Sequence, residues 1–192
     1  MRRRPRPATI IFDLGRTLVP FSLAPLQERV RGCRAEAERL FAQAETGRLD
    51  PERFRGGVCA LTGLAPEEFP AWWNSIFQPG WLIAPELVRE LQPGYRLGLL
   101  SNTNAIHFDF LRAERPLLDE FDFRVLSHEV GAAKPHPAIY AAAEAQAGCP
   151  PGAILYFDDV PEYVVAAQRR GWHAVQFREA SDLAVALRRY PD

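Results

Sequence analysis

The sequence predicts an α/β protein whose core is a Rossmann-like parallel sheet, with a small all-helical cap inserted after the first strand. Three nearly continuous apolar runs carry this prediction, because strands that are covered on both faces of a parallel sheet have this composition. They are residues 8–12, 95–100 and 153–157. Each run ends in small polar or acidic residues, and stretches of helical periodicity follow, as is typical of βαβ units.

Two further apolar runs and four helical stretches complete the expected core. The runs at 123–126 and 173–177 could add strands, and helices are expected over 104–114, 137–148, 161–171 and 181–189. Pro137 and Pro161 stand at first helical positions, while Gly148 and Gly171 follow helix ends, which is the usual placement of both residue types.

Residues 20–85 interrupt this alternation and predict the helical cap. Apolar residues recur at three- and four-residue steps from Leu23 to Ala44, which predicts one long amphipathic helix that stops at Gly47. Asp50 then has the character of an N-cap residue at the start of a second helix.

The segment at 66–77 predicts a third helix in the cap, bent or restarted at Pro70. It contains the adjacent residues Trp72 and Trp73. Neighbouring side chains on a helix point about 100° apart, so at most one tryptophan is expected to face a cleft. The expected domains are therefore a core of residues 8–19 and 86–192 and a cap of residues 20–85.

Composition limits the partners and the location that we expect. The formal net charge is -1 over 192 residues, so nothing in the overall balance favours nucleic acid or an anionic membrane. Residues 1–7, with four arginines, are expected to form a disordered basic arm. The three cysteines are widely spaced and show no CxxC motif, which favours a reducing, cytoplasmic location and excludes a disulfide framework.

Polar residues at the ends of the predicted strands form a candidate catalytic set. Asp13, Asp158 and Asp159 would crowd one edge of the sheet, where like charges are unfavourable unless a cation offsets them. Mg²⁺, which prefers oxygen ligands, is the expected cofactor, and Lys134 is a candidate second cation. A carboxylate beside Mg²⁺ can act as a nucleophile on phosphorus.

Four motifs in this order resemble those of the haloacid dehalogenase superfamily. They are "FDLGRTL", "LLSN", "KP" and "YFDD". The resemblance implies that Asp13 is the nucleophile, that Ser101 holds the phosphate and that Lys134 steadies both. It further implies that Asp159 contacts the metal directly and Asp158 through water, and that Asn102 contacts the substrate.

Gly15 departs from the usual phosphatase motif of this superfamily, which has a second aspartate there as general acid and base. Loss of such a group typically costs about 10²- to 10⁴-fold in rate. Gly15 keeps the backbone carbonyl through which relatives bind the metal. The sequence resembles the subgroup with an Asp-Leu-Gly-Asn first motif, which includes sugar-phosphate phosphatases, although Arg16 replaces the usual small or amide residue. Arg16 could clamp the phosphate or pair with an acid.

The expected function is Mg²⁺-dependent hydrolysis of a small phosphate monoester, similar to a sugar phosphate, through an aspartyl-phosphate at Asp13. The expected partner is a small phosphorylated metabolite, with the chain a monomer or homodimer. One alternative is a metal-independent 2-haloacid dehalogenase, since these enzymes also lack the second aspartate. Another is a weak or inactive relative that binds a phosphorylated metabolite or a protein partner.

Overall fold

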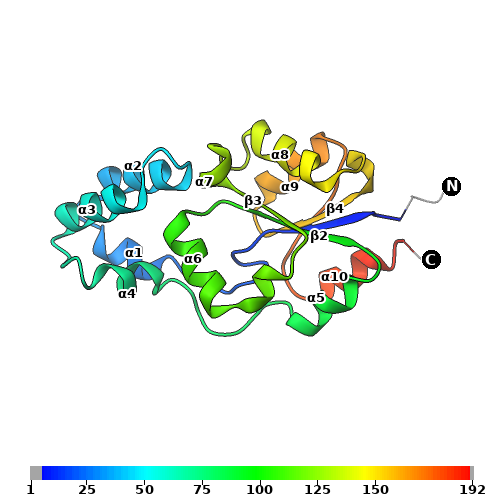
Figure 1. The fold of residues 1–192 in the computed structure, drawn as a ribbon, viewed down its shortest axis with the longest axis horizontal. Helices are drawn as coiled ribbons and strands as arrows, with labels where there is room; N and C mark the ends of the chain where they lie inside the picture. The colour runs from blue at the N-terminus through cyan, green and yellow to red at the C-terminus, as the bar shows by residue number, and fades with distance from the viewer. Residues whose placement is uncertain (1–5, 191–192) are drawn as a thin grey trace.

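The computed structural model describes residues 6–190 and contains a parallel sheet of five strands in the order β3-β2-β1-β4-β5 (Figure 1). The strands are β1 (Thr9–Phe12), β2 (Arg96–Ser101), β3 (Phe123–Leu126), β4 (Ile154–Asp158) and β5 (His173–Gln176). All five runs that were predicted as strands form strands, and the α/β fold class is confirmed.

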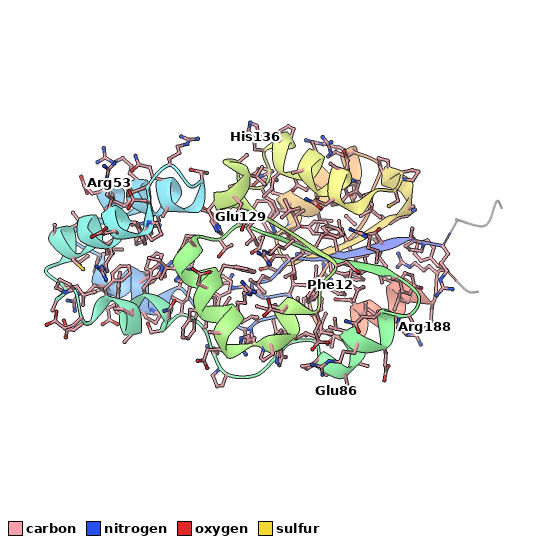
Figure 2. All side chains as sticks on the ribbon, in the orientation of Figure 1. Phe12, Arg53, Glu86, Glu129, His136 and Arg188 are labelled. Atoms are coloured by element: carbon pink, nitrogen blue, oxygen red, sulfur yellow. The ribbon has the colours of Figure 1, made fainter. Side chains whose placement is uncertain are left out.

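Apolar side chains at alternate strand positions pack into two hydrophobic cores, one on each face of the sheet. On β1, Ile10 and Phe12 enter one cluster and Ile11 enters the other, as the two-residue side-chain period of a strand requires. The first cluster is covered by α5 (Pro85–Leu91), α6 (Ala105–Glu114) and α10 (Ser181–Leu187). The second is covered by α8 (Pro137–Ala147) and α9 (Pro161–Arg169). Figure 2 shows Phe12 inside the molecule, whereas Glu86 and Arg188 lie at its rim.

A third apolar cluster belongs to the helices between the first two strands, α1 (Ala24–Arg29), α2 (Arg34–Glu45), α3 (Pro51–Thr62) and α4 (Phe69–Asn74). Phe54, Phe69 and Trp73 lie at its centre, with the rings of Phe69 and Trp73 stacked 5.8 Å apart. Figure 1 shows these helices at one end of the molecule and α10 near the other. They therefore form a group with its own core, beyond the carboxyl ends of the strands.

The prediction of one long helix from Leu23 to Ala44 is wrong. The segment forms two helices, α1 and α2, because the chain leaves the helical path between them. Cys33 precedes α2 with extended φ, -138°. Gly32 has low helix propensity and Val30 is β-branched, so the intervening segment supports a helix poorly. The other two helices are as expected: Asp50 caps α3 by accepting from the N–H groups of residues 52 and 53, and α4 starts at Phe69 with Pro70 in its first turn.

The short elements α7 (Ser127–Val130), η1 (Pro116–Asp119) and η2 (Pro151–Ala153) were not predicted, and neither was α5. The expected basic arm lies outside the described residues at positions 1–5. At position 6 the expectation fails, since the Arg6 guanidinium lies 4.8 Å from the centre of the Tyr95 ring. Between residues 6 and 190, no helix has both the length and the apolar character needed to cross a membrane.

The strand order places the candidate residues at one position of the sheet. The chain adds β2 and β3 on one side of β1 and then returns to add β4 and β5 on the other. Ligands of such sheets bind beyond the carboxyl ends of the strands where the order reverses. Asp13 directly follows β1 and Asp158 is the last residue of β4, and the Asp13 N–H donates to the Phe157 carbonyl at 2.8 Å.

Candidate active site

Three carboxylates meet at the carboxyl ends of β1 and β4. One carboxylate oxygen from each of Asp13, Asp158 and Asp159 lies within 4.8 Å of the other two. Asp13 and Asp158 are buried, whereas Asp159 is half-buried. The structure thus brings together the three acids that the sequence assigned to one edge of the sheet.

Lys134 lies between two of these acids. Its ammonium group donates to Asp13 Oδ1 at 2.7 Å and to Asp158 Oδ2 at 2.6 Å, and it also donates to the Leu100 carbonyl at 3.0 Å. Lys134 is the only lysine of a chain otherwise rich in arginine. A compact ammonium can direct its three N–H groups to three separate oxygens, which a planar guanidinium cannot do in the same space.

Burial controls the protonation of the Asp13–Lys134 pair. It raises the pKa of the Asp13 carboxyl to about 7, with a smaller contribution from the charge of Asp158, while Lys134 opposes the shift. Burial lowers the pKa of Lys134, but the charges and hydrogen bonds of Asp13 and Asp158 outweigh it, so the net shift is upward. Lys134 therefore stays a cation, and it is the cation that keeps Asp13 from a still higher pKa.

The donor set fits a hard divalent cation. Three carboxylates face one ammonium group, so the cluster has excess negative charge. Burial and the charge of Asp158 also raise the pKa of Asp159, although Arg16 and Lys134 oppose the shift. Oxygen ligands and unbalanced negative charge are what Mg²⁺ requires of a protein site.

The two acids of the "YFDD" motif differ in their freedom to bind a metal. Both oxygens of Asp158 have protein partners: Oδ1 accepts from the Val160 N–H at 2.8 Å, and Oδ2 accepts from Lys134 and the Tyr156 hydroxyl. Asp159 lies at the cavity described below, and Asp158 is fully buried behind it. This arrangement favours Asp159 as the direct ligand.

Ser101 and Asn102 follow β2 and lie beside the carboxylates. Ser101 is a largely buried residue that lines the cavity described below, and its hydroxyl makes no hydrogen bond within residues 6–190, so it is available to a ligand. The Asn102 amide is already engaged, which the sequence did not indicate. Its oxygen accepts from the Lys134 N–H at 2.7 Å, and its nitrogen donates to the Lys134 carbonyl at 3.0 Å and the Tyr163 hydroxyl at 3.3 Å. Asn102 positions Lys134, and a contact with substrate stays a prediction.

The loop after β1 explains the glycine at position 15. A Cβ atom on Gly15 would lie 2.4 Å from Cε1 of Phe21, far inside van der Waals contact. The Phe21 ring therefore occupies the space that a side chain at this position would need. The Arg16 guanidinium lies 4.8 Å from the centre of the same ring, and Arg16 adopts a left-handed φ of 56°. Arg16 lines the cavity described below and forms no ion pair with a carboxylate of the described chain, so contact with the phosphate stays a prediction.

A cavity of about 450 Å³ opens over the carboxylates, between the sheet edge and helices α1, α2 and α4. Its polar lining includes Asp13, Arg16, Ser101, Asn102, Lys134 and Asp159. Phe21, Leu26, Phe41, Ile76 and Phe77 contribute an apolar wall. Of the adjacent tryptophans Trp73 lines the cavity and Trp72 does not, in line with the expectation for neighbouring helix positions.

Sequence reasoning missed the two tyrosines that support Lys134 and Asp158. Tyr156 is fully buried, and its hydroxyl lies 3.2 Å from the Lys134 ammonium while it donates to Asp158. The Lys134 ammonium also lies 5.1 Å from the centre of the Tyr163 ring. The two-residue period of β4 was an available signal, because it places Tyr156 on the same face as Asp158.

This fold and this site define a hydrolase of a known class. The sequence model of the haloacid dehalogenase-like hydrolase family matches residues 7–171, and the chain belongs to that family. The D-ribitol-5-phosphate phosphatase of Bacteroides thetaiotaomicron is 28% identical over 151 residues, which are 74% of this chain and 73% of that protein.

Solved structures show the same similarity. A haloacid dehalogenase family enzyme from Bacteroides thetaiotaomicron, in complex with magnesium and inorganic phosphate, has a TM-score of 0.79 and 26% identity, over 92% of this chain and 98% of that one. A predicted hydrolase of this family from Porphyromonas gingivalis has a TM-score of 0.79 and 28% identity, over 97% of both chains. The similarity therefore extends over the core and the helices inserted after β1.

Proposed function

We propose that this chain is a Mg²⁺-dependent phosphatase of small phosphate monoesters, with a sugar or alditol phosphate as substrate. The observation that carries the proposal is the cluster of Asp13, Asp158 and Asp159 around Lys134, at the base of a cavity. A related phosphatase of an alditol phosphate, and a similar structure that holds magnesium and phosphate, support it.

Asp13 acts as the nucleophile in this proposal. An oxygen of Asp13 attacks phosphorus, the bond from phosphorus to the ester oxygen breaks, and the leaving oxygen takes a proton from water. Water then attacks the aspartyl-phosphate, which releases inorganic phosphate and restores Asp13. Lys134, 2.7 Å from Asp13, holds the attacking carboxylate and offsets the charge of the phosphoryl group.

Asp13, Asp159 and the Gly15 carbonyl would hold Mg²⁺, with Asp158 behind them. Bound Mg²⁺ supplies charge that reduces repulsion between the carboxylate and the phosphoryl oxygens. The Ser101 hydroxyl donates to a phosphoryl oxygen. Gly15 has no side chain to protonate the leaving oxygen, so we expect slow turnover of esters whose leaving alcohols are poor.

Residues 20–85 serve as the cap and residues 8–19 and 86–192 as the catalytic core in this proposal. The separate apolar cluster of α1–α4, and its position over the cavity, support this division. A cap in this place excludes bulk water and contacts the organic part of the substrate.

The test is phosphate release from a panel of esters, including D-ribitol 5-phosphate, with and without Mg²⁺. We expect Mg²⁺-dependent release that Asp13→Asn abolishes and that Asp109→Asn, on the exposed face of α6, leaves unchanged. Chloride release from 2-chloropropionate without metal would instead show the dehalogenase alternative. A folded protein that binds phosphate with Mg²⁺ but releases none would show the inactive relative.

A further inference from the structure

Glu45 is a carboxylate of the cavity for which the proposed reaction has no role. It is the last residue of α2, it is half-buried, and it lines the same cavity as the catalytic cluster. The other carboxylates among the described lining residues are Asp13 and Asp159, which belong to the metal cluster. Glu45 is therefore the acidic group that the cap helices direct to the cavity.

The Glu45 carboxylate makes no hydrogen bond and no ion pair within residues 6–190. Other acids of the same helix are paired: Glu38 with Arg34 at 2.7 Å, and Glu36 with Arg39 at 3.3 Å. Burial raises the pKa of Glu45, and the charge of Lys134 opposes this shift. A half-buried acid without a partner is unfavourable in the absence of a ligand, because its desolvation is not compensated.

The surroundings of Glu45 indicate what it would bind. The cap side of the cavity is otherwise apolar, so a polar group in the organic part of a substrate would find few other partners there. The Tyr163 hydroxyl also lines the cavity, and the charge of Glu45 contributes to the raised pKa of Tyr163. A carboxylate beside a phenol is a good acceptor for substrate hydroxyl groups.

We propose that Glu45 accepts hydrogen bonds from the hydroxyl groups of the substrate tail and so determines specificity. This inference rests on the proposed function, since it assumes that phosphate binds at Asp13. It assigns the substrate to the phosphate esters of uncharged polyhydroxy compounds. It also predicts discrimination against esters with a second acidic group, because that group would lie beside the Glu45 carboxylate.

The test compares Glu45→Gln with the wild-type enzyme on three phosphate esters. D-ribitol 5-phosphate has tail hydroxyls, n-pentyl phosphate has a tail of equal length without them, and 2-phosphoglycolate has an acidic tail. We expect kcat/KM for D-ribitol 5-phosphate to fall about ten- to hundredfold. We expect little change for n-pentyl phosphate and a rise for 2-phosphoglycolate.

The alkyl ester separates this role from acid catalysis. Its leaving alcohol is as poor as that of the alditol phosphate, so loss of a general acid would lower kcat on both esters equally. Equal losses on both would overturn the proposal, as would unchanged kinetics on D-ribitol 5-phosphate. Glu28→Gln, at an exposed position of α1, is the matched control and should behave as wild type.

Binding of phosphate esters to the Asp13→Asn protein tests the role of Glu45 in substrate recognition, even if the chain releases no phosphate. Calorimetric titration with D-ribitol 5-phosphate and with n-pentyl phosphate, in the presence of Mg²⁺, measures the two affinities without turnover. The proposal requires that the tail hydroxyls increase affinity and that Glu45→Gln removes this increase. Equal affinities for the two esters would overturn it, whereas absent turnover with intact discrimination would overturn only the proposed function.

Discussion

A single buried lysine balances the acids of this site. Lys134 contacts Asp13 and Asp158 within 2.7 Å, and its side chain is 1% exposed. Removing one partner of a buried ion pair leaves the other charge uncompensated, which is more destabilising than the loss of a surface pair. We therefore expect the lysine that contacts Asp13 to contribute to the stability of the fold as well.

We expect Lys134→Met to lower the free energy of unfolding by about 3–5 kcal/mol, because it leaves two buried carboxylates facing each other. Urea denaturation without metal measures the change, and added Mg²⁺ should recover part of it. Arg89→Met is the matched control: its pair with Glu120 is solvent-exposed, and its loss should cost much less than the loss of Lys134. A Lys134→Met protein as stable as the control would contradict this account.

The loop that follows β1 is the element in which this chain departs most from the usual motif. Gly15 and Phe21 occupy one space, and Arg16 stacks on the Phe21 ring. The ring thus fills the space that a side chain at position 15 would need. A return to aspartate requires a change at Phe21 as well as at position 15.

We expect Gly15→Asp alone to destabilise the protein by about 1–3 kcal/mol, since the new Cβ overlaps the Phe21 ring. In a Phe21→Ala background the same change should cost clearly less, because the ring is gone. A double-mutant cycle of unfolding free energies measures this coupling. Additive effects would show that the ring moves aside freely.

At the scale of the whole molecule, a neutral histidine of α6 connects the sheet-covering helices to α4. The His107 Nε2–H donates to the Trp73 carbonyl at 2.9 Å, and its ring stacks on Trp73 at 4.4 Å. A carbonyl can only accept, so Nδ1 is the acceptor, 3.1 Å from the Asn104 amide nitrogen. The Asn104 oxygen accepts in turn from the His107 N–H and from Trp73 Nε1, which fixes the orientation of the amide. A proton on Nδ1 would face the donors of Asn104.

This contact makes stability depend on pH. Burial lowers the pKa of His107 from 6.5 to about 4, and the hydrogen bond to Trp73 opposes the shift. Below pH 6.5 the unfolded chain binds a proton that the folded protein does not bind until about pH 4, so stability contributed by neutral His107 is complete above pH 6.5 and falls between these values. The full loss is about 3 kcal/mol.

Urea denaturation of wild type and His107→Gln between pH 7.5 and 4.5 measures this effect. The stability advantage of the wild type should shrink as the pH falls, whereas Gln43→Ala, at an exposed position of α2 that has no titratable side chain, should show a constant difference. An advantage of wild type that does not change with pH would mean that His107 titrates alike in the folded and unfolded chains.

The sequence by itself determined the sheet, its strands and the meeting of Asp13, Asp158 and Asp159, because two-faced burial leaves continuous apolar runs and parallel strands end at one edge. Motif order also identified Lys134 as their partner. Only the tertiary structure decided what fills each space around them. Folding brings together residues that no sequence pattern links: Phe21 packs against Gly15, Tyr156 lies behind Lys134, and Glu45 lines the cavity. No local period encodes which residues meet across the cap and core, since packing between distant segments selects them.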